Sequence, residues 1–339
     1  MARLNNNLTE AKRNKKDEFY TTLEDIEQEL KYYKNHFAGK VVYCNCDDAR
    51  ESNFFRFFQK KFIDYGLKKL ITTSYNENGH GSVLVYEGDT NGNGKLDEHE
   101  VKVSELKGNG DFRSEECIEL LKEADIVVTN PPFSLFREYI ATLVQYDKKF
   151  LVIGNQNAIT YKEIFPLIKE NKLWLGVSMN GSNRWFRVPE DYNFKENAAN
   201  TKIDEKGNKF IFVNGVVWFT NIDHARRHDS IILWKKYSEE EFPKYDNYDA
   251  IEVSKVTNIP KDYDGIMGVP ITFLHKYNPS QFEIVDPRDF TDVERLKSKN
   301  TMLIKDKDSA INGKPTYARI AIRKKIIALF SFDKKTFVN

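Results

Sequence analysis

The sequence predicts an α/β fold built on a doubly wound, mostly parallel β-sheet, and three observations support this. Short apolar runs typical of buried strands alternate with segments whose apolar residues recur at helical spacing, up to about residue 240. This alternation is the pattern of successive βαβ units, which place helices on both faces of a sheet. The 339 residues are 40% hydrophobic and 13% aromatic, which is enough to build a sizeable core.

The first strand and the helix after it are strongly marked. Residues 41–43 form a short apolar run typical of a strand, and residues 70–74 form a second one. Between them, residues 52–65 predict a helix with one buried aromatic face, made of Phe54, Phe55, Phe58 and Phe62. The loop at residues 44–51 lies directly after a strand and before a helix, where a doubly wound sheet binds its nucleotide.

A β-hairpin-like insertion is predicted at residues 80–107. Residues 83–86 and 101–103 are typical of strands, and the segment between them is rich in Asp, Asn and Gly. The twelve residues from Asp89 to Glu100 also fit a calcium-binding loop, with the turning glycine at Gly94. Because the flanking segments are strands and not the helices of an EF-hand, a polar hairpin tip explains the same composition. Calcium binding therefore stays open.

The rest of the sheet follows the same alternation. Ser114 before Glu115 and Glu116 is a good start for a helix that runs to residue 123. Strands are predicted at residues 126–128, 150–153, 173–177, 216–220 and 231–234, and helices at residues 135–146 and 161–170. After Tyr237 the composition shifts toward Tyr, Asp and Pro, which places a domain boundary near residue 240. The chain then has two parts, residues 1–240 and residues 241–339.

The stretch that carries chemistry is Asn130-Pro131-Pro132-Phe133, directly after a buried strand. Asn130 offers a side-chain carbonyl oxygen, and the two prolines fix a corner at which the carbonyl of Pro131 points outward. Two acceptors then converge on one ligand NH2 group. Phe133 is placed to stack on the base that carries this amine. The alternative is an ordinary turn with a core aromatic.

Such a corner solves a problem of aromatic amines. The lone pair of adenine N6 is delocalised into the ring, so this nitrogen is a poor nucleophile. Accepting both of its hydrogens favours a pyramidal nitrogen whose lone pair faces an electrophile. No strong general base is needed, because the amine becomes acidic once it is alkylated.

The same run, Asn130 to Phe133, resembles the catalytic motif of the amino-methyltransferases that use S-adenosylmethionine. Residues 17–21, 41–48, 110–114 and 127–139 together resemble the EcoRI-type adenine-specific DNA methyltransferases, and the resemblance runs from the N-terminal arm to about Arg323. The resemblance implies a Rossmann-like class I methyltransferase domain followed by a target recognition region. It also implies methylation of adenine N6 in a short duplex site by base flipping, as part of a restriction-modification system or in phage or plasmid self-protection.

The resemblance further implies which residues hold S-adenosylmethionine. Phe19, Tyr20 and Thr21 match the segment that closes over the methionine end of the cofactor. Asp111 accepts from the adenine amine of the cofactor, and Phe112 packs on its ring. The loop with Cys44, Asn45 and Asp47 departs from the usual glycine-rich pattern. Either the chain approaches the cofactor less closely there, or the carboxylates of Asp47 and Asp48 take the cofactor's amino group.

DNA contacts are expected at aromatic and basic positions. Phe186 is the candidate for sandwiching the extruded base, with a core aromatic as the alternative. Arg226 and Arg227 form a small basic cluster suited to phosphate, and Arg319 and Arg323 are the phosphate candidates of the recognition region. The net charge of +1 does not mark a nucleic-acid binder, so these contacts require a locally uneven charge distribution.

Two other functions fit parts of the sequence. A protein glutamine-amide N-methyltransferase faces the same delocalised nitrogen, but such enzymes lack a long C-terminal recognition segment. A calcium-binding, non-catalytic module uses the hairpin tip, but it leaves the Asn130 corner unexplained. Duplex DNA is the expected partner, and a cognate restriction endonuclease acting on the same site without a stable complex is a further candidate.

Composition sets the remaining expectations. The N-terminus is polar and lacks an apolar signal core, and no stretch is long enough to span a bilayer, so a cytoplasmic protein is expected. The resemblance to the EcoRI type implies that it acts as a monomer. Cys44, Cys46 and Cys117 are too few and too poorly spaced for a disulfide framework or a zinc site. We therefore assign no metal ligands.

Overall fold

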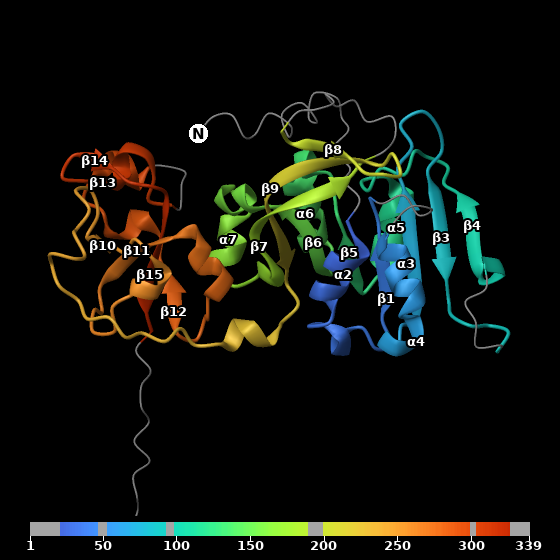
Figure 1. Cartoon of the computed structure of the whole chain (residues 1–339), viewed down its shortest axis with the longest axis horizontal. Coiled ribbons are helices and arrows are strands. Elements are labelled where there is room, and N and C mark those ends of the chain that lie inside the picture. Colours follow the sequence, from blue (N-terminus) through green and yellow to red (C-terminus); the bar gives the residue numbers. More distant parts are fainter. Residues whose placement is uncertain (1–20, 47–52, 93–97, 189–198, 299–302, 326–339) are drawn as a thin grey trace, which may run out of the picture. The chain divides into compact units, whose positions relative to one another are not determined.

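The computed structural model describes residues 21–325 except for residues 47–52, 93–97, 189–198 and 299–302 (Figure 1). The chain divides into two compact units, Met1–Arg226 and Arg227–Asn339. The division lies upstream of the boundary expected near residue 240, because residues 227–240 belong with the second unit. Each unit is described on its own below.

Unit 1 (Met1–Arg226) is built on a nine-stranded mixed sheet with the order β4-β3-β2-β1-β5-β6-β9-β7, and β8 pairs with β9. Its centre is parallel, from β2 through β1 and β5 to β6, which confirms the predicted α/β class. The parallel strands are β1 (Val41–Cys44), β2 (Lys69–Ser74), β5 (Ile126–Thr129) and β6 (Lys149–Asn155). The antiparallel strands are β3 (Ser82–Tyr86), β4 (Val101–Glu105), β7 (Trp174–Arg187), β8 (Thr201–Ile203) and β9 (Lys209–Thr220).

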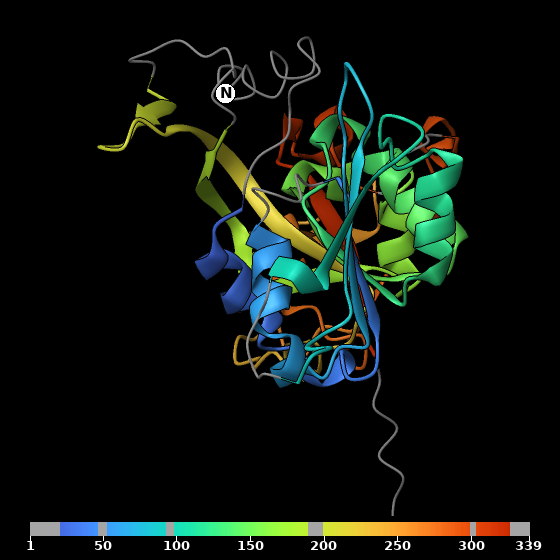
Figure 2. The same ribbon diagram turned by 90° about the vertical axis from the view of Figure 1, so that its right-hand side faces the viewer.

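Helices flank this sheet where the apolar periodicity predicts them (Figure 2). They are α2 (Leu23–Leu30), α3 (Asn53–Lys60), α4 (Phe62–Tyr65), α5 (Glu115–Glu123), α6 (Phe136–Gln145) and α7 (Phe165–Lys169). The helix predicted at residues 52–65 was expected to bury one aromatic face, and all four of its phenylalanines are buried: Phe54, Phe55, Phe58 and Phe62. Ser114 caps α5 by accepting a hydrogen bond from the backbone N–H of Cys117, as expected.

The predicted β-hairpin is confirmed, and it lies at the edge of the sheet. β3 pairs antiparallel with β2, and β4 pairs antiparallel with β3. In the connecting loop, the Glu100 carboxylate accepts from the backbone N–H of Thr90 at 2.6 Å, and Asp89 accepts from Gly92 at 2.6 Å. Asn93 and Asp97, which occupy ligand positions of the calcium-loop pattern at Asp89 to Glu100, lie outside the described residues. Calcium binding is therefore untested, and the oxygens that are described serve the turn itself.

One predicted strand is wrong. Residues 231–234 form no strand: the side chains of Ile232 and Trp234 are 85% and 64% exposed. The apolar run suggested a buried strand, but both edges of β9 are already taken by β6 and β7. Conversely, β7 (Trp174–Arg187) extends well beyond the strand predicted at residues 173–177, because the polar residues that follow continue the strand.

A buried glutamate accommodates an irregularity in β7. The pairing of β7 with β9 shifts register between Leu175 and Asn180. At this point Glu29 of α2, which is fully buried, accepts from the backbone N–H groups of Val177 at 2.8 Å and Ser178 at 2.6 Å. Tyr33 donates its hydroxyl to the same carboxylate at 2.8 Å. The Glu29 side chain thus replaces hydrogen bonds that the strand loses at the shift.

We expect Glu29→Ala to lower the free energy of unfolding by about 3 kcal/mol or more, because it leaves two buried backbone donors without acceptors. Urea unfolding followed by circular dichroism measures this. Glu27→Ala is the matched control on the same helix, since the Glu27 side chain is 63% exposed and faces Lys61 at 3.6 Å. Its effect should stay within about 0.5 kcal/mol. Equal stability of the two variants would contradict the assigned role of Glu29.

Unit 2 (Arg227–Asn339) has its own small core and its own sheet, with the strand order β10-β11-β15-β12. The strands are β10 (Ala250–Glu252), β11 (Ile266–Pro270), β12 (Phe282–Ile284) and β15 (Arg319–Lys324), and β13 (Ala310–Ile311) pairs with β14 (Lys314–Pro315). Its short α-helix is α8 (Glu294–Lys297). In the described part of the whole chain, no helix has the length and apolar character required to cross a membrane.

Candidate active site

The parallel strands β1, β2 and β5 of unit 1 end at one common edge of the sheet (Figure 1). Asn45 and Asn130 follow two of these strands. The end of β5 contacts the loop after β1 directly, since the Thr129 hydroxyl donates to the backbone carbonyl of Asn45. The hydroxyl of Thr72, on β2, donates to the carbonyl of Cys44 at 2.6 Å. Asn45 and Asn130 are therefore brought together by the carboxyl ends of neighbouring strands, as a doubly wound sheet requires.

The predicted corner lies directly after a fully buried strand. All four residues of β5 are buried, and Asn130 follows with 5% of its side chain exposed. The carbonyl of Pro132 accepts from the backbone N–H of Leu135 at 3.0 Å, which starts a short 3-10 helix, Phe133–Leu135. Within the described residues, the carbonyl of Pro131 receives no hydrogen bond. Phe133 is 8% exposed and belongs to the core cluster of unit 1.

Thr21 connects the N-terminal segment to this corner. Its hydroxyl accepts from Nδ2 of Asn130 at 3.4 Å, and its backbone carbonyl accepts from Nδ2 of Asn53 at 2.6 Å. Thr21 is 3% exposed. Because the amide nitrogen of Asn130 faces Thr21, the amide oxygen faces away from it. Phe19 and Tyr20, the other two residues expected in this segment, lie outside the described residues.

Tyr139 is a site residue that the sequence did not reveal. Its hydroxyl donates to Oδ1 of Asn45, and its ring packs edge-on against Phe112 with centroids 5.1 Å apart. Burial raises the pKa of Tyr139 well above its ordinary value, so the hydroxyl stays protonated and donates. The only sequence signal was a polar tip on the buried face of α6. Tyr139 thus joins Asn45 to Phe112.

The remaining residues predicted to hold the cofactor, Cys44, Asp47 and Asp111, differ in their surroundings. Cys44 is fully buried at the end of β1, where its thiol acts as a small apolar group, and Asp47 lies outside the described residues. Asp111 is partly exposed and pairs with Arg113, whose guanidinium holds the pKa of the Asp111 carboxyl below its ordinary value. Arg113 also reaches Glu138 at 3.1 Å. One lone pair of Asp111 Oδ2 is left for an additional donor.

A close approach of two loops positions Asp111 and Phe112. The backbone N–H of Asn76, after β2, donates to the carbonyl of Asn109 at 2.8 Å. Gly110 has a φ of +83°, and a Cβ there would lie 2.0 Å from the carbonyl oxygen of Ser74. Only glycine fits this position. The segment before α5 is therefore pressed against the end of β2, on the same edge as Asn130.

The DNA-contact candidates of unit 1 have different environments. Phe186 is 1% exposed and belongs to the core cluster, which agrees with the core-aromatic alternative. Arg226 is exposed and lies over the ring of Tyr32 at 5.7 Å. It follows Asn221 to Asp223 past the amino end of β6, at the edge opposite Asn130, and is therefore a poor candidate for phosphate beside the flipped base.

In unit 2 the structure corrects one expectation. Arg319 is 8% exposed and forms a buried ion pair with Glu252, with an Nη2–Oε1 distance of 2.5 Å. Its guanidinium is therefore committed to a structural contact and does not face DNA phosphate. Arg227 is also 8% exposed, in the 3-10 helix Ala225–His228, which makes it a poor surface contact. Arg323 remains a candidate, since it is half exposed and pairs with Glu283 at 2.5 Å.

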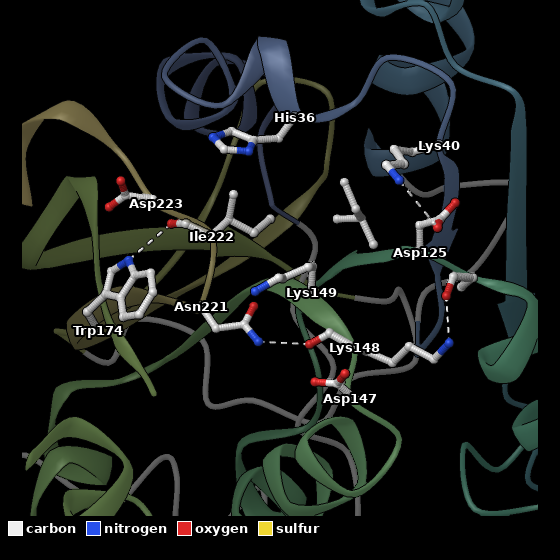
Figure 3. A pocket seen from close by; sticks show the side chains of 12 residues that line it. His36, Lys40, Asp125, Asp147, Lys148, Lys149, Trp174, Asn221, Ile222 and Asp223 are labelled. Atoms are coloured by element: carbon white, nitrogen blue, oxygen red, sulfur yellow. Dashed lines mark hydrogen bonds and ion pairs between the residues drawn. The ribbon is translucent and has the colours of Figure 1, made fainter. Parts of the chain in front are cut away.

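A hollow of about 580 Å³ lies at the opposite edge of the sheet, near the amino ends of β1, β5 and β6 (Figure 3). Its polar groups largely bond one another: Trp174 donates to the carbonyl of Ile222 at 3.0 Å, and Asn221 donates to that of Lys148 at 2.8 Å. None of the predicted site residues lines this hollow.

Comparison with known proteins gives a consistent result. The family described as the adenine-specific methyltransferase EcoRI matches residues 7–325. Type II methyltransferase M.EcoRI of Escherichia coli is 51% identical over 328 residues, covering 94% of this chain and 96% of its own length. Type II methyltransferases M.MgeORF184P of Mycoplasma genitalium and M.MpnI of Mycoplasma pneumoniae are 41% and 40% identical, covering 94% and 93% of this chain and 98% and 97% of their own lengths. The chain therefore belongs to the EcoRI family of adenine-specific methyltransferases.

Proposed function

We propose that this enzyme transfers a methyl group from S-adenosylmethionine to N6 of an adenine that is flipped out of a short duplex DNA site. One observation supports the proposal: at the end of β5, Asn130 and the carbonyl of Pro131 supply two acceptors, and the Asn130 amide oxygen, which is buried, faces away from Thr21. The relatives named above are Type II methyltransferases, which supports site-specific methylation within restriction-modification.

The residues at this edge fit S-adenosylmethionine in their chemistry. Asp111 has acceptor capacity for an adenine amine, and Phe112, backed by Tyr139, offers an apolar ring for the base. Thr21 and Asn45 supply polar groups near the corner. When bound, this cofactor supplies a methyl group on a positively charged sulfur. We assign Asp47 to its amino group on the basis of the family pattern.

The amine is activated by orientation. Asn130 Oδ1 and the Pro131 carbonyl accept its two hydrogens and hold the nitrogen pyramidal, with its lone pair toward the methyl carbon. Most of the acceleration then comes from proximity and alignment. Extruding the base costs a few kcal/mol, and contacts to the flipped base in the site offset part of this cost. Phosphate contacts, for which Arg323 is the half-exposed candidate, contribute the rest.

The target recognition region is proposed to lie within unit 2, from the boundary near residue 240 that the sequence indicates; the compact unit itself begins at Arg227. The protein is proposed to act as a cytoplasmic monomer on duplex DNA. A restriction endonuclease that cuts the same site is a functional counterpart without a stable complex.

Neither alternative function is favoured. The family match over residues 7–325 is to adenine-specific enzymes, which disfavours a protein glutamine-amide methyltransferase. A non-catalytic calcium module leaves both this match and the Asn130 corner unexplained.

A methyl-transfer assay tests the proposal. The purified protein is incubated with labelled S-adenosylmethionine and plasmid DNA from a methylation-deficient host, and modified adenines are mapped by long-read sequencing. We expect N6-methyladenine at one short sequence. Label on protein glutamine, or no label on DNA, would reject the proposal.

Thr21 supplies a narrower test of the corner. We expect Thr21→Val to lower kcat by about fivefold, because losing one hydrogen bond worth roughly 1 kcal/mol lets the Asn130 amide rotate. The KM for DNA should change little, and Thr21→Ser should restore kcat. Single-turnover kinetics at saturating cofactor separate this from weaker cofactor binding. A kcat equal to that of the wild type would contradict the positioning role.

A further inference from the structure

A projecting β-hairpin extends past the edge of the sheet that carries Asn130. β6 ends at Asn155, which pairs with Val216, whereas β9 begins at Lys209. The segment from Lys209 to Val216 therefore continues beyond β6 by roughly 23 Å at the rise of an extended strand. β7 accompanies it, and β8 adds a third strand (Figure 2). Since β5 and β6 are parallel, this extension lies on the same side as the corner after β5.

The two faces of this hairpin differ sharply. On one face, Phe186, Val188, Ile211 and Val213 are buried in the core of unit 1. On the other face, Trp185 lies directly opposite Phe212, with ring centroids 5.0 Å apart. Arg187 lies opposite Phe210 on this same outer face. The three outer aromatic residues are only half buried.

A lysine on β8 completes the outer face. Lys202 pairs with Phe210, and its Nζ lies 4.6 Å from the ring centroid of Trp185 and 5.1 Å from that of Phe210. Lys202 is exposed, and among the described residues it has no acidic partner. Its stem covers aromatic surface while its ammonium group stays in reach of solvent. We call Trp185, Lys202, Phe210 and Phe212 the hairpin platform.

We propose that the hairpin platform binds the DNA strand that flanks the target adenine, which rests on the proposed function. Half-exposed rings with a cation are the chemistry that recognises nucleic acid, since bases and sugars stack on the rings and phosphate attracts the cation. The location of the platform also fits DNA binding. DNA that delivers a base to Asn130 has to approach the carboxyl edge of the sheet, past which the platform extends. The platform is separate from the buried Phe186 side of the hairpin, so it contacts duplex next to the flipped base.

Three variants of the full-length enzyme test this. We expect Trp185→Ala to weaken DNA binding by about tenfold or more, because one stacked base is worth roughly 1 to 3 kcal/mol, and Trp185→Phe to recover part of the loss. Lys202→Ala should weaken binding and reduce the slope of log K against log salt by about 1. Binding of S-adenosylmethionine should not change. Lys122→Ala, which removes an exposed lysine from α5, is the charge-matched control and should leave the salt slope unchanged.

Intrinsic fluorescence gives an independent readout. Of the four tryptophans, Trp185 alone belongs to the platform. DNA bound at the platform should therefore quench the emission of the wild type more than that of Trp185→Phe, which keeps only the other three. Unchanged affinity, salt slope and quenching in an enzyme that still methylates DNA would overturn the platform alone. Failure of the wild type to methylate DNA would overturn the proposed function instead. If Trp185→Ala abolished a wild-type dimer and left DNA affinity intact, the platform would be a contact between copies and the inference would be wrong.

Discussion

Replacing Asn130 by alanine is expected to lower the rate of methyl transfer by about 100-fold to 1000-fold or more, the scale of losing one preorganised electrostatic contact in an active site. The substitution removes the amide oxygen that accepts one amine hydrogen and leaves only the Pro131 carbonyl. Binding of S-adenosylmethionine should be largely kept, since Asn45, Asp111 and Phe112 are untouched. Single-turnover methylation of duplex DNA and calorimetric titration of the cofactor measure the two effects.

Two further variants make this result interpretable. Asn130→Asp keeps an acceptor oxygen and should lose less rate than Asn130→Ala. Asn221→Ala removes an asparagine at the opposite edge of the sheet, where its side chain accepts from the N–H of Phe150 at 2.9 Å and donates to the carbonyl of Lys148. This control should cost stability and leave the rate at low temperature nearly unchanged. Substantial activity in Asn130→Ala would remove Asn130 from the mechanism.

The sequence predicted the features that depend on local pattern. The buried run of β5 and its stop at the two prolines, the cap at Ser114 and the hairpin at β3 and β4 are all set by neighbouring residues. The corner was therefore visible without coordinates. Family resemblance added the cofactor roles, of which Thr21, Asn45 and Asp111 lie at the expected edge.

The features that the sequence did not predict depend on contacts between distant residues. Tyr139 and Asn45 are 94 positions apart, so no spacing rule could pair them. In the sequence, Asn53 is an ordinary asparagine at the start of a helix. Only the structure shows that its side chain donates to the backbone carbonyl of Thr21. Residues 231–234 have the apolar pattern of a strand, but a strand also needs a free sheet edge, which the pattern does not contain. The sequence also could not show that Arg319 is unavailable to phosphate, because its buried partner Glu252 lies 67 positions away.

Arg319→Ala is expected to destabilise unit 2 by about 3 to 5 kcal/mol, because it leaves the Glu252 carboxylate buried without its cation. The two side chains are only 9% and 10% exposed, and Tyr245 donates its hydroxyl to the same carboxylate. Burial and the nearby Glu252 carboxylate raise the pKa of Tyr245. The Tyr245 hydroxyl therefore keeps its proton and cannot neutralise Glu252 by transferring this proton to it. Site-specific methylation should be lost when unit 2 unfolds, while cofactor binding by unit 1 is retained.

The neighbouring Arg323 supplies the matched control, since it belongs to the same strand but its ion pair with Glu283 is half exposed. Arg323→Ala should cost at most about 1 kcal/mol of stability and weaken DNA binding without unfolding. Replacing both members of the buried pair, by Glu252→Leu with Arg319→Met, should restore much of the stability lost in Arg319→Ala, because no charge is then left uncompensated. Urea unfolding and limited proteolysis of unit 2 measure these differences. If Arg319→Ala and Arg323→Ala were equally stable, the buried pair would not hold unit 2 together, and Arg319 would return as a surface candidate for DNA.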